Sequence, residues 1–354
     1  MTNERARELQ EEGAAASQGL LYLSRDDILA LQIDMHDVVS VVEEAFRLKG
    51  CGQVLMPPKV TMSGQAGAFV QVMPAWVAGG APAGTAPAGT ATAGTGALGL
   101  KLVTVFPDNQ TEDVPTTNAV IVLDDPRTGL PLAIMDGGLI TALRTGASVG
   151  AAARHLAVSD ARTTAVLGCG VQARSAVRAL ADVLPALDDV RYYDVEPRVA
   201  AAFAAELAVE FPDVRFIPCE DPGQVCHDAQ VVVTAITMGT GTPPPLGSGL
   251  LEPGALAVAL DYDAAWAPAA MAECERFVTD DVAQTRATKA HGEWLARIPT
   301  VHADLGKVIA GLSPGRTAHN ERVFCLNLGI AVEDVVCARL LYERALAAGA
   351  GVRL

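Results

Sequence analysis

A short apolar segment that runs into two glycines and then into a helix constrains this sequence more than any other feature. Residues 163–170, TTAVLGCG, are typical of a buried strand that ends in a glycine turn. The next residues, 171–184, VQARSAVRALADVL, have the apolar spacing of a helix. The string Gly168-Cys169-Gly170-Val171-Gln172-Ala173 has the form G-x-G-x-x-A. Strand, glycines and helix together predict the nucleotide-binding turn of a dinucleotide fold.

Each position of this turn has an expected role. Gly168 allows the tight turn, and Gly170 lets the backbone approach a pyrophosphate at the helix N-terminus. Ala173 allows the helix to pack closely on the sheet. Asp194 ends the next predicted strand, 24 residues after Gly170, where a carboxylate would accept hydrogen bonds from the adenosine ribose. The alternative is a glycine-rich turn that has only a structural role and binds no ligand.

The predicted cofactor is NAD. A carboxylate at Asp194 would repel the 2′-phosphate of NADP. Arg191 and Arg198 lie nearby in the sequence and could weaken this preference, so NADP remains an alternative.

The alternation continues along the second half of the chain. Predicted strands at 189–196, 214–219, 229–236, 255–261 and 276–281 continue an alternation with helical segments. Strands that alternate with helices predict βαβ units and a doubly wound parallel sheet.

The first half has a different character. The segments 98–106 and 118–125 are strong strand candidates, and the turn PRTG leads from the second of them into 130–136. Such closely spaced strands favour an antiparallel sheet. Residues 78–97, between Val77 and Leu98, contain only Ala, Gly, Pro and Thr. This composition predicts a mobile loop, either a neutral insertion or an active-site lid.

Charge and composition exclude several classes of partner. The chain carries 26 Lys and Arg against 41 Asp and Glu, a formal charge of −15. An acidic surface repels phosphate backbones and anionic lipids, so we expect neither nucleic acid nor a membrane as a partner. The seven cysteines and six histidines are scattered without ligand spacing, which predicts no metal site and no disulfide framework. The N-terminal residues lack the apolar core of a signal peptide, so a cytoplasmic location fits best.

Several strings resemble one family, the ornithine cyclodeaminase/mu-crystallin family. They are MPPK (56–59), MPAW (73–76), LGLKLVTVFPDN (98–109), VPTTNAVIVLDDPRTGLPLAIMDG (114–137), LITALRTGASVGAAARHLA (139–157), LGCGVQA (167–173) and GIAVEDV (329–335). The resemblance implies a Rossmann-type α/β domain with a doubly wound parallel sheet, plus an α+β substrate-binding and dimerisation domain. On this basis we expect the substrate and dimerisation domain at 1–145, the NAD-binding domain at 146–310, and a returning C-terminal segment at 311–354. The family also implies a homodimer.

Lys101 lies in an otherwise apolar strand, on the face that it shares with Gly99 and Val103. On its own it would suit an edge strand. The resemblance implies instead that Lys101 is a catalytic residue, which contacts the substrate carboxylate or amine. Arg144 resembles the arginine that binds the substrate α-carboxylate, a task that suits its planar fork. The alternative for Arg144 is a salt bridge on a helix surface.

The resemblance assigns further contacts. Lys59 matches a position where many members carry an arginine for the same carboxylate, and a lysine keeps the charge but loses the fork. The substrate is expected to lie also against Leu328. The residues that match cofactor contacts of the family are Thr116, Val171, Gln172, Thr234 and Asn327.

Asp263 matches the catalytic aspartate of the family. Asp261 lies two residues before it, and both carboxylates would point the same way if the strand continued. Asp261 then either shares the acid–base role or only caps the strand. After Asp263, ornithine cyclodeaminases have a P-G-K-T-E-L-like string, whereas this chain has Ala264-Ala265-Trp266.

The expected function is an NAD(P)-dependent amino-acid dehydrogenase or an imine reductase that acts on the Cα–N bond. One alternative is a cyclodeaminase of the ornithine or lysine type, which releases ammonia without net redox change. The other is a nicotinamide-dependent protein that binds a small ligand, as mu-crystallin-like members do.

Overall fold

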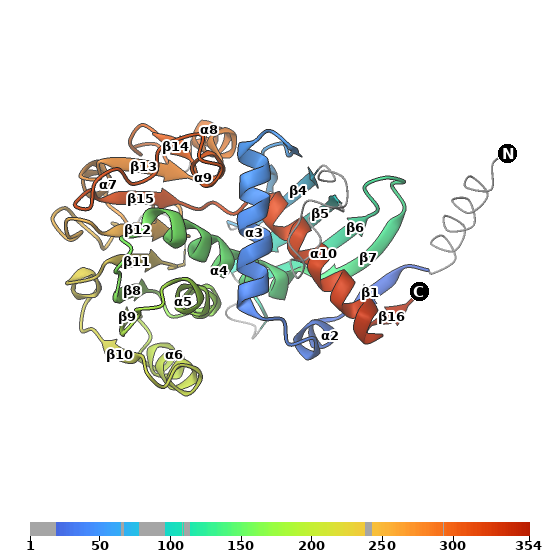
Figure 1. Ribbon diagram of the computed structural model, residues 1–354, viewed down its shortest axis with the longest axis horizontal. Helices are drawn as coiled ribbons and strands as arrows, with labels where there is room; N and C mark the ends of the chain where they lie inside the picture. The colour runs from blue at the N-terminus through green and yellow to red at the C-terminus, as the bar shows by residue number, and fades with distance from the viewer. Residues whose placement is uncertain are drawn as a thin grey trace. The chain divides into compact units, whose positions relative to one another are not determined.

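The computed structural model describes residues 19–64, 67–77, 96–107, 109, 114–237, 243–292 and 294–354 (Figure 1). The chain divides into two compact units. Unit 1 comprises residues up to Ile33, Val54–Ile140 and Asp334–Leu354, and unit 2 comprises Asp34–Gln53 and Thr141–Glu333. Most of the expected loop, residues 78–95, lies outside the described residues.

Unit 1 is built on an eight-stranded sheet with the order β16-β1-β7-β6-β5-β4-β2, and β3 pairs with β4. All strand pairs are antiparallel except β1 with β7, so the antiparallel character expected for the first half is confirmed. Its strands are β1 (Leu21–Leu23), β2 (Val54–Leu55), β3 (Val60–Ser63), β4 (Phe69–Val77), β5 (Ala97–Val105), β6 (Thr117–Asp124), β7 (Pro131–Asp136) and β16 (Val352–Arg353).

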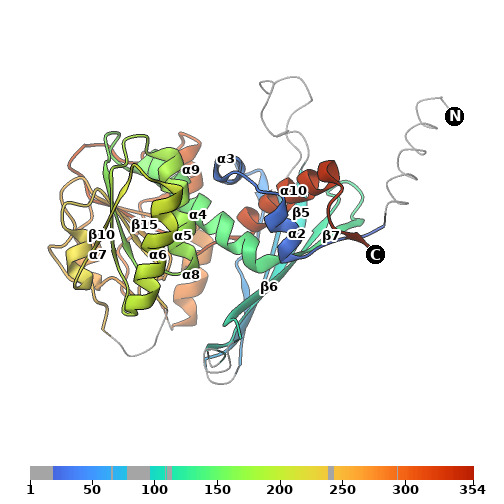
Figure 2. The same cartoon turned by 90° about the horizontal axis from the view of Figure 1, so that it is seen from below.

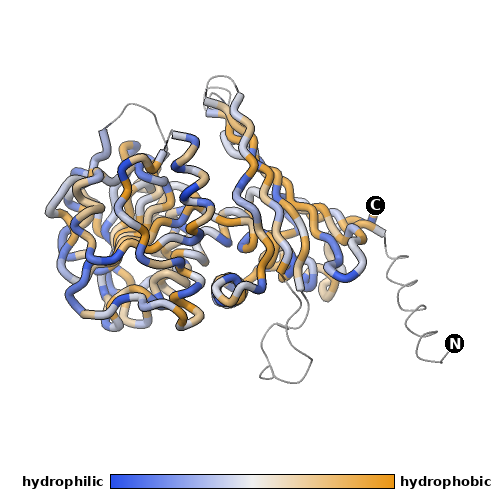
Figure 3. Tube along the Cα trace, turned by 90° about the horizontal axis from the view of Figure 1, so that it is seen from above, coloured by the Kyte–Doolittle hydropathy of each residue, from blue (hydrophilic) through white to orange (hydrophobic). Residues whose placement is uncertain are grey.

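The two faces of this sheet differ. Along β5, Gly99, Lys101 and Val103 are buried, whereas the alternate residues Leu98 and Leu100 are only half-buried. Helices α2 (Arg25–Ala30) and α10 (Ala331–Ala348) lie on one side of the sheet (Figure 2). The strands themselves are predominantly apolar (Figure 3). The alternation therefore produces one face that packs inside unit 1 and a second apolar face.

Unit 2 holds a second eight-stranded sheet with the order β10-β9-β8-β11-β12-β15-β13-β14, in which every pair is parallel (Figure 1). The order reverses between β8 and β11, as at the switch point of a Rossmann-type fold. The expected doubly wound parallel sheet is confirmed. Its strands are β8 (Thr163–Leu167), β9 (Asp189–Tyr193), β10 (Arg215–Pro218), β11 (Val231–Thr234), β12 (Leu256–Ala259), β13 (Arg276–Thr279), β14 (Ala303–Asp304) and β15 (Val323–Leu326).

Several helices lie wholly or mostly in unit 2 together with this sheet. They are α3 (Met35–Gly50), α4 (Gly137–Leu156), α5 (Val171–Val183), α6 (Pro197–Glu210), η2 (Pro222–Cys226), α7 (Pro268–Ala272), α8 (Val282–His291) and α9 (Leu305–Ile309). Two of the boundaries between the units fall within α4 and α10, and the other two lie on either side of α3. Within the described ranges, no helix has the length and apolar character that crossing a bilayer requires.

The compact units differ from the expected boundaries in two places. Helix α3 belongs to unit 2 although it precedes most of unit 1 in the sequence. Strand β15 lies between β12 and β13 in the unit 2 sheet, so residues 311–333 also belong to unit 2. Local patterns could not reveal either feature, because both depend on packing between distant segments.

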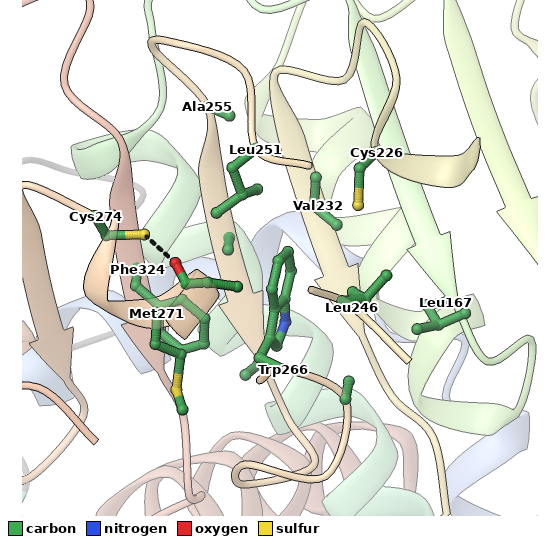
Figure 4. Packing of buried hydrophobic residues seen from close by; sticks show 14 of the residues in the cluster. Leu167, Cys226, Val232, Leu246, Leu251, Ala255, Trp266, Met271, Cys274 and Phe324 are labelled. Atoms are coloured by element: carbon green, nitrogen blue, oxygen red, sulfur yellow. Dashed lines mark hydrogen bonds between the residues drawn. The ribbon is translucent and has the colours of Figure 1, made fainter. Parts of the chain in front are cut away.

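The core of unit 2 explains Trp266. Its side chain is fully buried and meets the Phe324 ring edge-on, at 5.7 Å between ring centroids. The ring of Phe277 stacks on the ring of Phe324, with 5.0 Å between the ring centroids. Leu246 and Val232 lie in the same cluster (Figure 4). Trp266 is therefore a core residue of the sheet.

Candidate functional site

The turn between β8 and α5 has the tight geometry expected from the glycines. Gly168 has a φ of +87°, and its amide donates to the carbonyl of Tyr193 at 2.9 Å. A Cβ at residue 168 would lie 2.6 Å from the carbonyl oxygen of Ala235. Both the dihedral angle and the close backbone require glycine here.

Helix α5 begins at this turn with an open end. Gly170 is its N-cap and supplies no side-chain hydrogen bond, and a Cβ built there would meet no atom within 4 Å among the described residues. Val171 is 63% exposed, and Ala173 is fully buried. The Gln172 Oε1 atom is buried without a hydrogen-bond partner in the described part of the chain. Uncapped amides and the helix dipole suit a phosphate group.

Asp194 is fixed directly beside the glycine turn. Its Oδ2 accepts from the Cys169 amide at 2.7 Å, and its Oδ1 accepts from the Glu196 amide at 2.9 Å. Burial, with a smaller contribution from Asp194, raises the pKa of the Cys169 thiol to about 12. The thiol therefore stays neutral and adds no negative charge to the turn.

An open cleft of about 410 Å³ lies at the carboxyl ends of β9 and β10. Residues that line it include Tyr193, Asp194, Val195, Pro218, Cys219 and Glu220. Two carboxylates therefore border it. Arg191 donates to the Gln224 carbonyl at 3.3 Å, and Arg198 is exposed in the first turn of α6. The apolar and peptide surfaces of this cleft suit a flat ring.

Thr234 and Asp261 form a buried pair at the ends of β11 and β12. The Thr234 hydroxyl donates to Asp261 Oδ1 at 2.9 Å, and the Ile236 amide donates to Oδ2 at 3.0 Å. Asp261 is 2% exposed, and burial raises the pKa of its carboxyl to about 7. Both oxygens of Asp261 thus hold the segment that follows β11.

Asp263 has different surroundings. Strand β12 ends at Ala259, and Tyr262 has a φ of +58°, so the strand does not continue through the two aspartates. Asp263 Oδ2 accepts from the Leu295 amide at 3.1 Å. Its Oδ1 is buried with no hydrogen-bond partner in the described ranges. The condition for two carboxylates pointing the same way, a strand that continues through residues 261–263, is therefore not met.

Arg144 is buried in helix α4, with 6% of its surface exposed. Its Nη1 donates to Glu333 Oε2 at 2.7 Å, and Glu333 is fully buried. Arg144 thus forms a salt bridge, as the alternative interpretation had it, but the pair is buried and does not lie on the helix surface.

Asn327 and Leu328 follow β15. The backbone N–H of Asn327 donates to the Ala259 carbonyl at 3.0 Å. The side-chain amide of Asn327 donates to the Ser148 hydroxyl at 3.2 Å. Leu328 is 7% exposed. These contacts tie the segment after β15 to β12 and α4.

Lys101 belongs to unit 1 and is 1% exposed. It lies in β5, which is paired on both sides, so the edge-strand alternative is wrong. Its Nζ donates to Asp334 Oδ1 at 2.7 Å, and Asp334 is fully buried on α10. The strand thus carries a buried ion pair on its inner face.

Lys59 and Thr116 are also in unit 1, and both are half-buried. Lys59 lies between β2 and β3. The Thr116 carbonyl accepts from the Phe106 amide at 2.8 Å.

The structure therefore gathers most predicted residues at one edge of the unit 2 sheet. Because parallel strands end together, the residues that follow β8, β9, β11, β12 and β15 share this carboxyl edge. Sequence reasoning missed the acids that pair with the predicted cations, Glu333 and Asp334. Two adjacent acids in the apolar string GIAVEDVV were the signal, since such acids need buried partners.

Comparison with known proteins agrees with this architecture. The model of the ornithine cyclodeaminase/mu-crystallin family matches residues 23–349. An alanine dehydrogenase of Archaeoglobus fulgidus is 31% identical over 346 residues, which cover 94% of this chain and 98% of that protein. The structure of Thermococcus litoralis Delta(1)-pyrroline-2-carboxylate reductase with NADH and L-proline has a TM-score of 0.80 at 27% identity, and covers 95% of this chain and 100% of that one. An archaeal alanine dehydrogenase dimer with bound NAD has a TM-score of 0.79 at 29% identity, and covers 95% of this chain and 98% of that one.

Proposed function

The chain belongs to the ornithine cyclodeaminase/mu-crystallin family, and we propose that it is an NAD-dependent oxidoreductase acting on the Cα–N bond of an amino or imino acid. Its relatives include an alanine dehydrogenase and a pyrroline-2-carboxylate reductase, and both names describe redox chemistry on such compounds. The observation that carries the proposal is Asp263. Its buried Oδ1 lacks a hydrogen-bond partner among the described residues, at the same sheet edge as the glycine turn.

The residues of unit 2 fit NAD. The open end of α5 at Gly170 suits the pyrophosphate, with Gly168, Val171 and Gln172 around it. Asp194 would accept from the ribose hydroxyls. In unit 2, Thr234 and Asn327 would hold the nicotinamide half, and Thr116 of unit 1 is a further proposed cofactor contact.

The cleft favours NAD over NADP. Asp194 and Glu220 both line it, and a 2′-phosphate there would meet two carboxylates. Arg191 donates one N–H group to the Gln224 carbonyl and lies close to Cys219 at this cleft, so NADP stays the alternative cofactor.

Asp263 would exchange a proton with the substrate nitrogen. A bound nicotinamide would supply hydride chemistry at the substrate Cα, in either direction. In oxidation, Asp263 Oδ1 accepts a proton from the substrate nitrogen as the C=N bond forms, and in reduction it returns that proton. Both oxygens of Asp261 already accept hydrogen bonds, so we assign Asp261 a supporting role.

The substrate carboxylate would be held by cations. Arg144 offers a planar guanidinium whose position is set by Glu333. Lys101 would add a contact through its ammonium group, which Asp334 holds in place. Lys59 and Leu328 complete the residues proposed to contact the substrate.

The direct test combines purified protein with NAD and a panel of L-amino acids that includes alanine, proline, ornithine and lysine. Sustained NADH formation identifies a dehydrogenase, and NADH consumption with a cyclic imine identifies a reductase. Ammonia release from ornithine or lysine without net NADH would identify a cyclodeaminase instead. NADH binding without any turnover would favour a small-ligand binding protein.

Asp263→Asn should abolish turnover and leave NADH binding intact, since only the proton carrier is lost. Asp213→Asn, an exposed aspartate of the same unit, is the matched control. Full activity of Asp263→Asn would refute the assignment.

We also propose that the chain forms a homodimer through the outer face of the unit 1 sheet. This face presents half-buried apolar side chains from paired strands, namely Val72, Leu98, Leu100, Leu102, Val120, Val122 and Ile134, together with Trp76 at 44% exposure. A contiguous apolar face of this kind marks an interaction surface. One solved relative is described as a dimer.

Light scattering of the native chain should give the mass of two copies. Leu100→Glu places a charge in the middle of the proposed interface and should give a single copy. Val209→Glu, at a position of unit 2 that is 84% exposed, should leave the mass unchanged. A native chain that already has the mass of one copy would refute the dimer.

A further inference from the structure

Asp280 is a fully buried acid at the carboxyl end of β13. Its Oδ2 accepts from the Gly329 amide at 2.7 Å. Its Oδ1 accepts from the Asp281 amide at 2.7 Å and from the Thr279 hydroxyl at 3.2 Å. Because β13 pairs with β15, the carboxylate reaches across to the segment that follows the neighbouring strand.

Gly329 lies directly against Arg144. Its φ is +72°, and a Cβ there would lie 2.4 Å from Arg144 Nη1 and 3.0 Å from Cζ. The backbone at residue 329 therefore forms a surface for the guanidinium, and only glycine fits. Arg144 is bounded by this backbone on one side and by its hydrogen bond to Glu333 on another.

A lysine from a distant segment balances the negative charge of the acids near Asp280. Lys49, at the end of α3, donates to the Asp280 carbonyl at 3.0 Å and to Asp304 Oδ2 at 2.6 Å. It also lies 2.9 Å from Asp281 Oδ2. Burial of a carboxylate is costly unless it is paired and hydrogen-bonded. Each carboxylate oxygen of Asp280 accepts a hydrogen bond from a backbone amide, and these bonds fix the backbone at residues 281 and 329.

We propose that Asp280 is a positioning residue, which holds the turn at 327–329 against Arg144 and so sets the plane of the guanidinium. The importance of this plane rests on the proposed role of Arg144 in binding the substrate carboxylate. Two parallel hydrogen bonds to a carboxylate require the guanidinium to lie in the plane of that group. Asp280 acts through Gly329 and Arg144 and does not itself touch the substrate.

The test compares Asp280→Asn with Asp281→Asn in the full chain. An asparagine at 280 has one acceptor oxygen, so its amino group must face one of the two backbone amides. Asp281→Asn alters an acid of the same cluster, which caps α8 and pairs with Lys49 but does not contact Gly329. Asp280→Asn should lower kcat/KM about tenfold to a hundredfold through a higher substrate KM, with the NADH Kd unchanged. Asp281→Asn should keep the native KM.

A second readout does not depend on turnover. In a nitrogen–carbon correlation NMR spectrum of the arginine guanidinium groups, the Arg144 signal is identified by its absence from Arg144→Lys. Asp280→Asn and Gly329→Ala should both shift that signal, and Asp281→Asn should not. If native protein turns over no amino or imino acid, the proposed function fails while this spectrum still decides the role of Asp280. An unmoved Arg144 signal in Asp280→Asn, or equal KM changes in both aspartate variants, would overturn the proposal.

Discussion

The ion pair between Lys101 and Asp334 gives the sharpest test of how unit 1 is held together. Lys101 Nζ lies 2.7 Å from Asp334 Oδ1, and the two side chains are 1% and 0% exposed. Lys101→Met keeps most of the volume of the side chain but removes the ammonium group that donates to the buried Asp334 carboxylate. Removal of one partner from a buried pair costs about 3–5 kcal/mol.

Hydrogen exchange measured by mass spectrometry on peptides from β5 reports this loss within unit 1. Since about 1.36 kcal/mol corresponds to a factor of ten, the protection of these amides should fall by about a hundredfold to a few thousandfold. Lys59→Met, which removes a half-buried lysine from the same unit, should leave the protection of β5 unchanged.

The double variant Lys101→Met, Asp334→Leu separates stability from function. Replacement of a whole buried pair by apolar residues is often neutral or stabilising, so protection of β5 should return. Activity should stay lost, because the ammonium group proposed to contact the substrate is absent. Protection that is unchanged in the single variant would refute the energetic argument, and activity in the double variant would refute the substrate role of Lys101.

Three other predictions concern buried groups of unit 2. Burial raises the pKa of the Asp261 carboxyl from 3.8 to about 7. The native state thus keeps a proton that the unfolded chain has released, so this stability, about 4 kcal/mol at most, is present below about pH 4 and lost as the pH rises through about 7. Asp261→Asn should remove this part of the pH dependence of urea unfolding followed by circular dichroism, and unchanged pH dependence would contradict the assignment. Gly168→Ala should cost about 1–3 kcal/mol and abolish NADH binding in a fluorescence titration, whereas Gly247→Ala, where a Cβ meets no described atom within 4 Å, should not. Trp266→Ala should cost about 3–5 kcal/mol in urea unfolding, and a negligible loss would show that this core tolerates the cavity.

Much of the fold could be predicted because its signals are local. The strand, glycine turn and helix at 163–184 need only neighbouring residues, and the structure places β8, Gly168 and α5 there. The alternation around Lys101 likewise predicted its inner face correctly, together with Gly99 and Val103. Element type follows from spacing along a few turns of chain.

The partners of the candidate site residues could not be predicted in this way. Arg144 pairs with Glu333 across 189 residues of sequence, and Lys101 pairs with Asp334 across 233. No local period relates such positions.

The sequence by itself determined that one half of this chain is a parallel α/β fold with a dinucleotide turn, because those features depend on spacing and on glycine. Only the tertiary structure decided that β15 enters the sheet between β12 and β13, and that α3 packs within unit 2. It also separated Asp261 from Asp263, giving one carboxylate two donors and leaving an oxygen of the other without a partner in the described residues. These outcomes depend on which distant segments share a buried surface, and burial rather than residue type sets whether a charged group is held or can react.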